Sequence, residues 1–234
     1  ETIDYGPCAF MDIYSPETVF SSIDTKGRYA YNNQSKILSW NLARLAETMI
    51  PLVHENQDKA VSLLTASIED IKHLYDEYWL DYMSSKIGLS GKDSNDKELI
   101  NDLLFAMEDA KVDFTSVFRN LSKVLQNDGS EIMRLFSKSF LFDAWLIRWR
   151  DRLTKDGKSE AFVIENMNKI NPIYIPRNYK VEEVLKAAVS YQDIKPFSDF
   201  LSVLKNPFEE VTGNESYAGT GPISPSPYKT FCGT

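Results

Sequence analysis

The tripeptide Asp4-Tyr5-Gly6 is the first place in the chain where residue types and spacing could carry chemistry. The residues before it read as a short strand, and a carboxylate at the end of a strand can bind Mg²⁺. The glycine two positions later lets the backbone turn sharply beside the metal. Asp4 is therefore a candidate ligand for a metal that neutralises phosphate. An ordinary turn at the end of a strand is the competing interpretation.

The histidines offer a second candidate. His73 follows Glu69 by four residues and Asp70 by three, and a carboxylate three residues before a histidine recurs in the di-metal sites of helical bundles. Those sites need a second pair of this kind, and the other histidine, His54, has no such neighbours. We expect His73 to lie on the surface or at a cap.

Other catalytic patterns are weak. The stretch Gly219-Thr220-Gly221-Pro222 lacks the lysine and the following helix of a phosphate-binding loop, and no serine stands in a Gly-x-Ser-x-Gly elbow. Arg148, Arg150 and Arg152 interleave with Trp149, which could grip phosphate or RNA. The alternative is the outer face of a helix whose tryptophans belong to the core.

Composition and charge argue against nucleic-acid binding and against a membrane-spanning protein. The chain has 234 residues and a net charge of −8. An acidic protein is a poor general binder of nucleic acid, because phosphate affinity comes from lysine and arginine. No stretch approaches the roughly 18 apolar residues of a membrane span, and the first residues lack the basic and apolar regions of a signal peptide. We expect a protein of a reducing cytoplasm, without nucleic-acid or membrane partners.

The hydrophobic periodicity predicts a mainly α fold. Residues 1–34 read as irregular, residues 35–210 as helices, and residues 211–234 as an extended tail. A first helix should end at Pro51, a later one should cover residues 114–125, and one long helix should cover residues 131–153. One stripe at helical spacing predicts a core-facing helix: Leu64, Ile68, Ile71, Tyr75, Tyr78 and Tyr82.

Several blocks together are far more specific than any single motif. The chain closely resembles the selenoprotein O family of protein adenylyltransferases from its first residue to its last. The blocks that carry the resemblance are Asp4-Tyr5-Gly6-Pro7-Cys8-Ala9-Phe10-Met11-Asp12, Phe20-Ser21-Ser22-Ile23-Asp24, Gly27-Arg28-Tyr29-Ala30-Tyr31-Asn32-Asn33-Gln34, Trp40-Asn41-Leu42-Ala43-Arg44-Leu45-Ala46-Glu47, Asn171-Pro172 with Arg177-Asn178, and Tyr228-Lys229-Thr230-Phe231-Cys232-Gly233-Thr234.

The resemblance implies a kinase-like (pseudokinase) fold that transfers AMP from ATP to serine, threonine or tyrosine of proteins, with Mg²⁺ or Mn²⁺. It implies that Asp4 binds the metal and touches the nucleotide. Residues 1–34 would then be the Asp-Tyr-Gly motif with an activation-segment-like region, residues 35–210 the helical C-lobe, and residues 211–234 the tail.

The resemblance also implies that much of the machinery is missing from this chain. The family's glycine-rich loop, lysine, phosphate-binding arginines and catalytic base precede Asp-Tyr-Gly, so the chain corresponds to a C-terminal portion without the N-lobe and catalytic loop. We expect it to need the missing N-terminal half as a partner and to be inactive alone, with no catalytic base of its own. The alternatives are a helical scaffold without catalysis and, further off, a true protein phosphotransferase.

Redox control is a feature of some members of the family. They pair a cysteine of the activation segment with a cysteine or selenocysteine near the C-terminus, and Cys232 matches the second position. The first position falls at Phe20 here, and Cys8 is nearby but not equivalent. We expect Cys8 and Cys232 to be free thiols.

Overall fold

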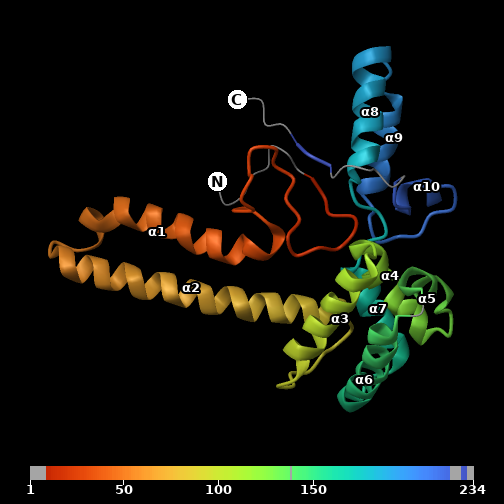
Figure 1. The fold of residues 1–234 in the computed structure, drawn as a ribbon, viewed down its shortest axis with the longest axis horizontal. Coiled ribbons are helices and arrows are strands. Elements are labelled where there is room, and N and C mark those ends of the chain that lie inside the picture. The colour runs from red at the N-terminus through yellow and green to blue at the C-terminus, as the bar shows by residue number, and fades with distance from the viewer. Residues whose placement is uncertain (1–8, 138, 222–227, 231–234) are drawn as a thin grey trace. The chain divides into compact units, whose positions relative to one another are not determined.

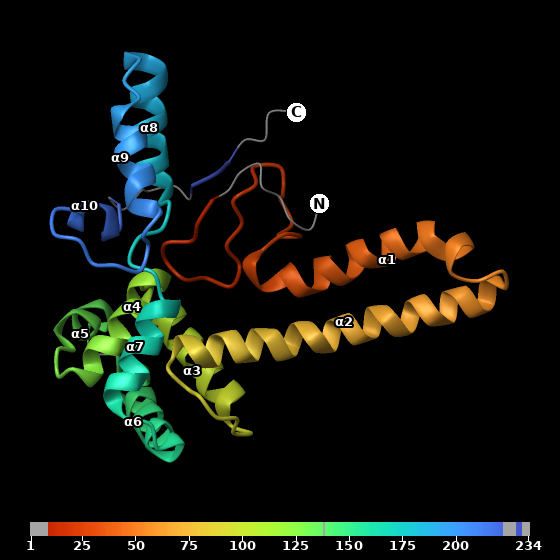
Figure 2. The same ribbon diagram turned by 180° about the vertical axis from the view of Figure 1, so that it is seen from behind.

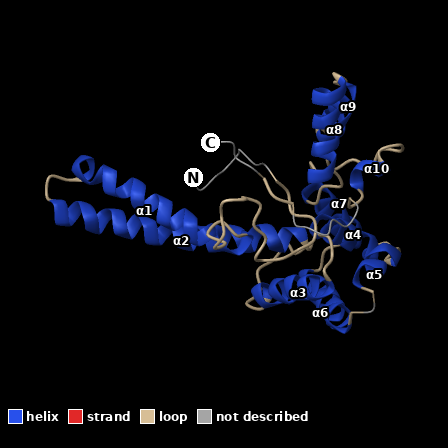
Figure 3. Ribbon diagram, turned by 45° about the horizontal axis from the view of Figure 1, so that its top comes forward, coloured by secondary structure: helices blue, strands red, loops and turns tan. Residues whose placement is uncertain are grey.

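The computed structural model describes residues 9–137, 139–221 and 228–230. Within these ranges the regular structure is helical, and no strand occurs (Figure 3). Two isolated β-bridges join Ile13 with Asp113 and Ser21 with Thr230. The predicted mainly α class is confirmed. None of the helices in the described ranges combines the length and the apolar character that crossing a bilayer requires.

The contacts divide the chain into two compact units. The first contains, among the described residues, 16–82 with 229 and 230. After an irregular stretch it holds the 3-10 turn η1 (Tyr31–Asn33), α1 (Gln34–Val53) and all but the last turn of α2 (Gln57–Lys86). Helices α1 and α2 run side by side as a hairpin (Figures 1 and 2).

Two expectations for this unit are wrong. Helix α1 does not stop at Pro51 but continues to Val53, because a proline in the last turn removes a single hydrogen bond. The stripe on α2 is not a core face, since Tyr78 is 61% exposed and Tyr82 is 70% exposed. A periodic stripe needs a covering surface to become core, and in this unit α1 leaves the far end of the stripe uncovered.

The second unit contains residues 9–15 and 83–228. Its core lies where α3 packs on α6 and α4 packs on α7. Its helices are α3 (Asp96–Ala110), α4 (Phe114–Leu125), α5 (Ser130–Phe136), α6 (Phe140–Asp156), α7 (Glu160–Ile170), α8 (Asn178–Tyr191), α9 (Lys195–Leu204) and the short α10 (Glu215–Ala218).

The tryptophans of α6 anchor this core. Trp145 and Trp149 are fully buried, one turn apart, and their rings stack with centroids 5.5 Å apart. Each indole N–H reaches a backbone carbonyl, of Leu99 at 2.8 Å and of Ile87 at 2.7 Å. The tryptophans are therefore core residues, which agrees with the second of the two interpretations given for the cluster around Trp149.

The single helix predicted over residues 131–153 is two helices, α5 and α6. Helix α5 ends at Phe136, because the next residue, Ser137, has a left-handed backbone (φ 46°) that cannot continue an α-helix. Ser139 then caps the new helix, because its hydroxyl accepts a hydrogen bond from the Phe142 N–H. The apolar periodicity runs through both helices and hides the break.

Candidate functional site

The site begins with the segment that follows the Asp-Tyr-Gly motif. Asp4, Cys8 and Cys232 lie outside the described residues. The first described segment after the motif is Ala9–Ser15, which belongs to the helical second unit. We call Ala9–Ser15 the strap.

The N-terminal end of the strap is held by one side chain of α8. The carboxamide Oδ1 of Asn178 accepts a hydrogen bond from the Phe10 N–H at 3.0 Å, and its Nδ2 donates to the Phe10 carbonyl at 2.8 Å. Asn178 is buried and is the first residue of α8. One amide therefore satisfies both backbone groups of Phe10, as a neighbouring strand would.

The other end of the strap pairs with the start of α4. The Phe114 N–H donates to the Asp12 carbonyl at 2.8 Å, and the Tyr14 N–H donates to the Val112 carbonyl at 2.9 Å. These bonds form the antiparallel bridge between Ile13 and Asp113. The ring of buried Tyr14 stacks on Phe114, with centroids 5.8 Å apart. The strap is thus fixed at both ends.

Between these ends, the guanidinium of Arg177 joins three segments of the chain. Nη1 donates to the carboxylate of Asp12 and, at 2.7 Å, to Oδ2 of Asp113. Nη2 donates to Oδ1 of Asp113 at 3.0 Å and to the Ala218 carbonyl at 3.2 Å. Asp113 also caps α4, because it accepts the Ser116 N–H at 2.7 Å. Strap, α4 and the end of α10 therefore meet at one buried side chain.

The electrostatics of this cluster favour the charged arginine. Arg177 is fully buried, the side chain of Asp113 is 2% exposed and that of Asp12 is 31% exposed. Burial lowers the pKa of Arg177, but the hydrogen bonds and charges of Asp113 and Asp12 outweigh it and raise the pKa above its usual value. Within the described part of the chain, Nε of Arg177 finds no hydrogen-bond partner.

The next residue of α8 contacts the start of the tail. The hydroxyl of Tyr179 donates to the carbonyls of Ser216 at 3.3 Å and Gly219 at 3.1 Å. The ring of Tyr179 packs so closely on Gly221 that a Cβ atom added to Gly221 would lie 2.4 Å from Cδ1 of Tyr179. Residues 177–179, which we call the hub, therefore bind the strap on one side and the tail on the other. Pro176 directly precedes the hub, and α8 starts after it.

A second cation of this unit, Lys86, lies among aromatic rings. Its Nζ is 4.8 Å from the ring centroid of Phe118 and 5.6 Å from that of Phe114, the ring that stacks on Tyr14. Desolvation by burial lowers the pKa of Lys86 to about 8. A ring face attracts a cation, but it replaces water less completely than a carboxylate does.

In the first unit, Thr230 of the tail pairs with the irregular stretch before η1. The Thr230 N–H donates to the Phe20 carbonyl at 2.8 Å, and the Ser22 N–H donates to the Thr230 carbonyl at 3.0 Å. This parallel bridge sets Thr230 beside the position where the resemblance places an activation-segment cysteine. The free-thiol state expected for Cys8 and Cys232 stays a prediction.

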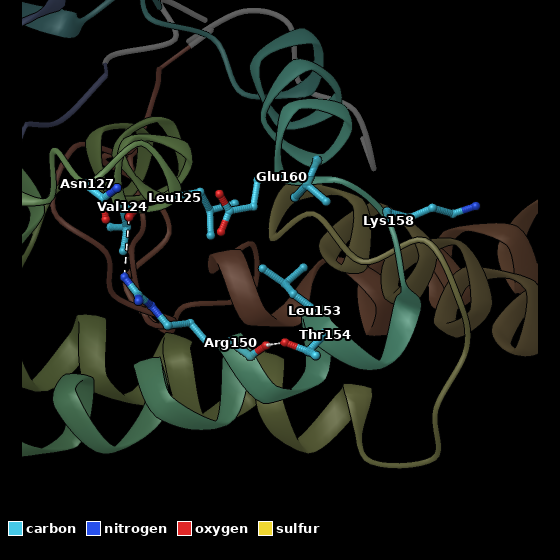
Figure 4. A pocket seen from close by; sticks show the side chains of 9 residues that line it. Val124, Leu125, Asn127, Arg150, Leu153, Thr154, Lys158 and Glu160 are labelled. Carbon is cyan, nitrogen blue, oxygen red and sulfur yellow. Dashed lines mark hydrogen bonds between the residues drawn. The ribbon is translucent and has the colours of Figure 1, made fainter.

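The second unit also contains a cavity of about 300 Å³ near the end of α4, where Arg150 donates to the Val124 carbonyl at 3.4 Å (Figure 4). Its remaining lining includes Thr154, Lys158 and Glu160. It shares no lining residue with the strap or the hub. Its walls are the ends of helices, and no candidate from the sequence other than Arg150 lies in it.

The remaining candidate residues, His73 and the arginines around Trp149, differ in their exposure to solvent. His73 is exposed, and no cluster of three metal-ligating side chains occurs in the ranges the structure describes. Of the arginines around Trp149, Arg148 lies on the outer face, whereas Arg152 is buried and paired with Asp96 and Asp156.

The sequence did not reveal that Arg177 and Asn178 hold the strap through hydrogen bonds. The family-like pair Arg177-Asn178 was visible, and its position after a proline was a further signal. The partners at Phe10, Asp12 and Asp113 are remote in sequence, so no spacing could reveal them.

Comparison with known proteins gives consistent matches along the chain. The family model described as "Protein adenylyltransferase SelO" matches residues 1–205. Proteins named "Protein nucleotidyltransferase YdiU" from Geobacillus kaustophilus and Anoxybacillus flavithermus are 47% and 45% identical over 234 residues. One from Clostridium botulinum is 46% identical over the same length. Each alignment covers all of this chain and 47% of the relative, so the chain spans about half the length of the curated relatives it matches.

Proposed function

The chain belongs to the SelO family of protein adenylyltransferases, and we propose that it forms the C-terminal part of an enzyme that transfers AMP from ATP to serine, threonine or tyrosine hydroxyls of proteins. In this proposal Asp4 contacts the nucleotide and holds Mg²⁺ or Mn²⁺. The helical region is the C-lobe of a kinase-like fold. The enzyme acts in the bacterial cytoplasm, where ATP is available.

The observation that carries the proposal is the continuity between motif and strap. The family match starts at residue 1 and so includes Asp4, and the segment that follows is fixed to the helical unit by backbone and side-chain bonds. A nucleotidyl transfer develops negative charge on phosphate oxygens, and a bound metal ion offsets that charge. In this proposal the chain's own contribution is the Asp4 carboxylate, which precedes the anchored strap in sequence and would help to position the metal and the nucleotide.

We propose that the chain does not transfer AMP alone. The matched relatives are about twice as long, and one carboxylate without a phosphate clamp or base cannot position the reaction. The partner is the N-terminal half of the same enzyme.

The test joins the N-terminal half of the Geobacillus kaustophilus relative to this chain and measures the intact mass of a generic protein substrate after incubation with Mg-ATP. We expect AMP addition by this chimera, none by the chain alone, and none by the chimera carrying Asp4→Ala. The matched control is Asp109→Ala, which removes an exposed carboxylate of α3 and should leave transfer unchanged.

Other outcomes contradict the proposal in distinct ways. AMP addition by the chain alone would mean that it holds catalytic residues of its own. Phosphate addition in place of AMP would mean a phosphotransferase. An assembled chimera that adds nothing would favour a helical scaffold.

A further inference from the structure

The strap is docked mainly by polar contacts. Phe10 is 40% exposed and Ile13 is 47% exposed, so two of its large apolar side chains contribute little to a core. Hydrophobic burial is non-directional and would tolerate several alignments of a short segment. The alignment of the strap is set by hydrogen bonds, those of Asn178 and Arg177 together with the backbone bridge to the start of α4.

Asn178 selects a single alignment. Its amide pairs with the N–H and the carbonyl of the same residue, Phe10, at 3.0 and 2.8 Å. A slip of the strap by one residue would break both bonds. It would also move Asp12 away from Arg177 and turn its side chain to the opposite face.

Arg177 is difficult to explain as a stabiliser alone. A buried ion pair is often no more stabilising than apolar side chains of the same volume, because both charges lose their water. Arg177 is fully buried and leaves Nε without a partner in the described part of the chain. What this arrangement adds over an apolar contact is a defined position for Asp12, 165 residues away in sequence.

The geometry has a consequence for Asp4, which precedes Phe10 by six residues. The strap is the first described segment after the motif, and a slip of the strap by one residue would shift its chain by roughly 3.4 Å. Misplacing a reacting group by about 1 Å can cost about 100-fold in rate. The position of the strap therefore sets the point at which the chain that follows Asp4 joins the helical second unit.

We propose that Arg177 and Asn178 are positioning residues for AMP transfer, which act through the strap to set the place of the Asp4 carboxylate. The inference rests on the proposed function. Neither residue contacts the nucleotide in this proposal. Both act by fixing the segment that carries Asp4 to the start of α8.

The first test uses the 234-residue chain itself and hydrogen exchange read by mass spectrometry. Asn178→Ala removes both bonds to Phe10. The matched control is Asn120→Ala, which truncates a buried asparagine of α4 whose Nδ2 donates to the Ser116 carbonyl of the same helix at 2.8 Å. We expect Asn178→Ala to raise exchange in strap peptides at least about tenfold, with α3 and α6 unchanged. Equal strap exchange in the two variants would overturn the proposal.

The second test uses the chimera that transfers AMP. We expect Asn178→Ala to lower kcat at saturating ATP by about tenfold or more and to raise the Mg²⁺ concentration for half-maximal rate. Asn120→Ala should change neither, even where its melting temperature falls by a similar amount. Arg177→Lys should behave like Asn178→Ala, because an ammonium keeps the charge but cannot form the forked contact with Asp113.

The outcomes separate this inference from the proposed function. If Asp4→Ala abolishes transfer while Asn178→Ala matches Asn120→Ala in kcat and in Mg²⁺ dependence, the positioning role is wrong and the proposed function stands. If Asp4→Ala transfers AMP at the wild-type rate, the role of Asp4 fails and the positioning role fails with it.

Discussion

Two buried arginines of the second unit have nearly the same chemistry and different positions in the chain. Arg152 binds Asp96 through Nε at 2.6 Å and Nη2 at 3.1 Å, and binds Asp156 through Nη1. Arg177 likewise binds two carboxylates, of Asp113 and Asp12. The pKa of Arg152 is raised by its bonds with Asp96 and Asp156, and that of Arg177 is also raised.

The difference lies in what the carboxylates are attached to. Asp96 and Asp156 lie on α3 and α6, the helix pair that forms the core, and Asp156 also accepts the Ser90 N–H at 2.8 Å. Asp12 lies on the strap, whose exposed residues add little to the core. The same ion-pair chemistry therefore strengthens a core in one place and fixes a segment in the other.

The largest effect should come from Arg152→Met, which leaves two carboxylates with 3% and 9% side-chain exposure without their cation. We expect the free energy of unfolding to fall by about 3–5 kcal/mol. Urea unfolding followed by the fluorescence of buried Trp145 and Trp149 measures this. A loss below about 1 kcal/mol would mean that the Arg152 cluster does not hold the core.

Arg177→Met should cost less, about 2–3 kcal/mol, because the partly exposed Asp12 can hydrate and Asp113 still accepts the Ser116 N–H. Hydrogen exchange should show the loss first in the strap. In Arg152→Met the exchange should rise throughout α3 and α6 instead. Identical exchange patterns in the two variants would remove the distinction between the two arginines.

Lys86 sharpens the comparison, because this buried cation faces aromatic rings. Its pKa in the folded chain is about 8, against 10.5 for an ordinary lysine. Between these values the unfolded chain binds a proton that the folded chain lacks, so stability rises with pH from about 8 to about 10.5. Below pH 8 Lys86 is charged in both states, and the full free-energy cost of burying its charge remains.

Lys86→Met removes this titration. We expect the stability advantage of Lys86→Met over the wild type to shrink by on the order of 2 kcal/mol between about pH 7 and about pH 10. Urea unfolding of both proteins at each pH measures the difference, and other titrating groups cancel. A difference independent of pH would show that Lys86 keeps its proton throughout.

The smallest effect should come from Arg148→Met. The pair between Arg148 and Asp102 has an Nη2–Oδ2 distance of 2.6 Å, but the side chains are 49% and 42% exposed. Exposed pairs contribute about 0–1 kcal/mol, and salt screens them. We expect a change below about 0.5 kcal/mol in urea unfolding. A loss as large as that of Arg152→Met would contradict the assignment of stability to burial.

Local pattern predicted the helical part of the fold well. The helix over residues 114–125 has the predicted bounds, and the tryptophans of α6 are in the core. These features depend on spacing within a few turns, which a single sequence displays. The break between α5 and α6 was missed, because the left-handed backbone conformation at this break belongs to Ser137. Glycine and asparagine indicate such a conformation in a sequence, whereas serine does not.

The candidate site was predictable only in part. The resemblance pointed to Asp4, but the side-chain bonds that Arg177 and Asn178 make to the strap join residues 165 and 168 positions apart. One sequence carries no covariation, so such pairs cannot be found from it. Arg152 shows the same limit, since its place three residues after Trp149 gave no sign that it was buried rather than on the outer face.

The bridge between Thr230 and residues 20–22 has a consequence for biosynthesis. Thr230 is made 210 residues after Phe20, and ribosomes add about 5–20 residues per second. Phe20 and Ser22 are therefore made roughly 10–40 s before this partner. The contact can close only after synthesis has passed Thr230, so it follows the synthesis of all the helices between them.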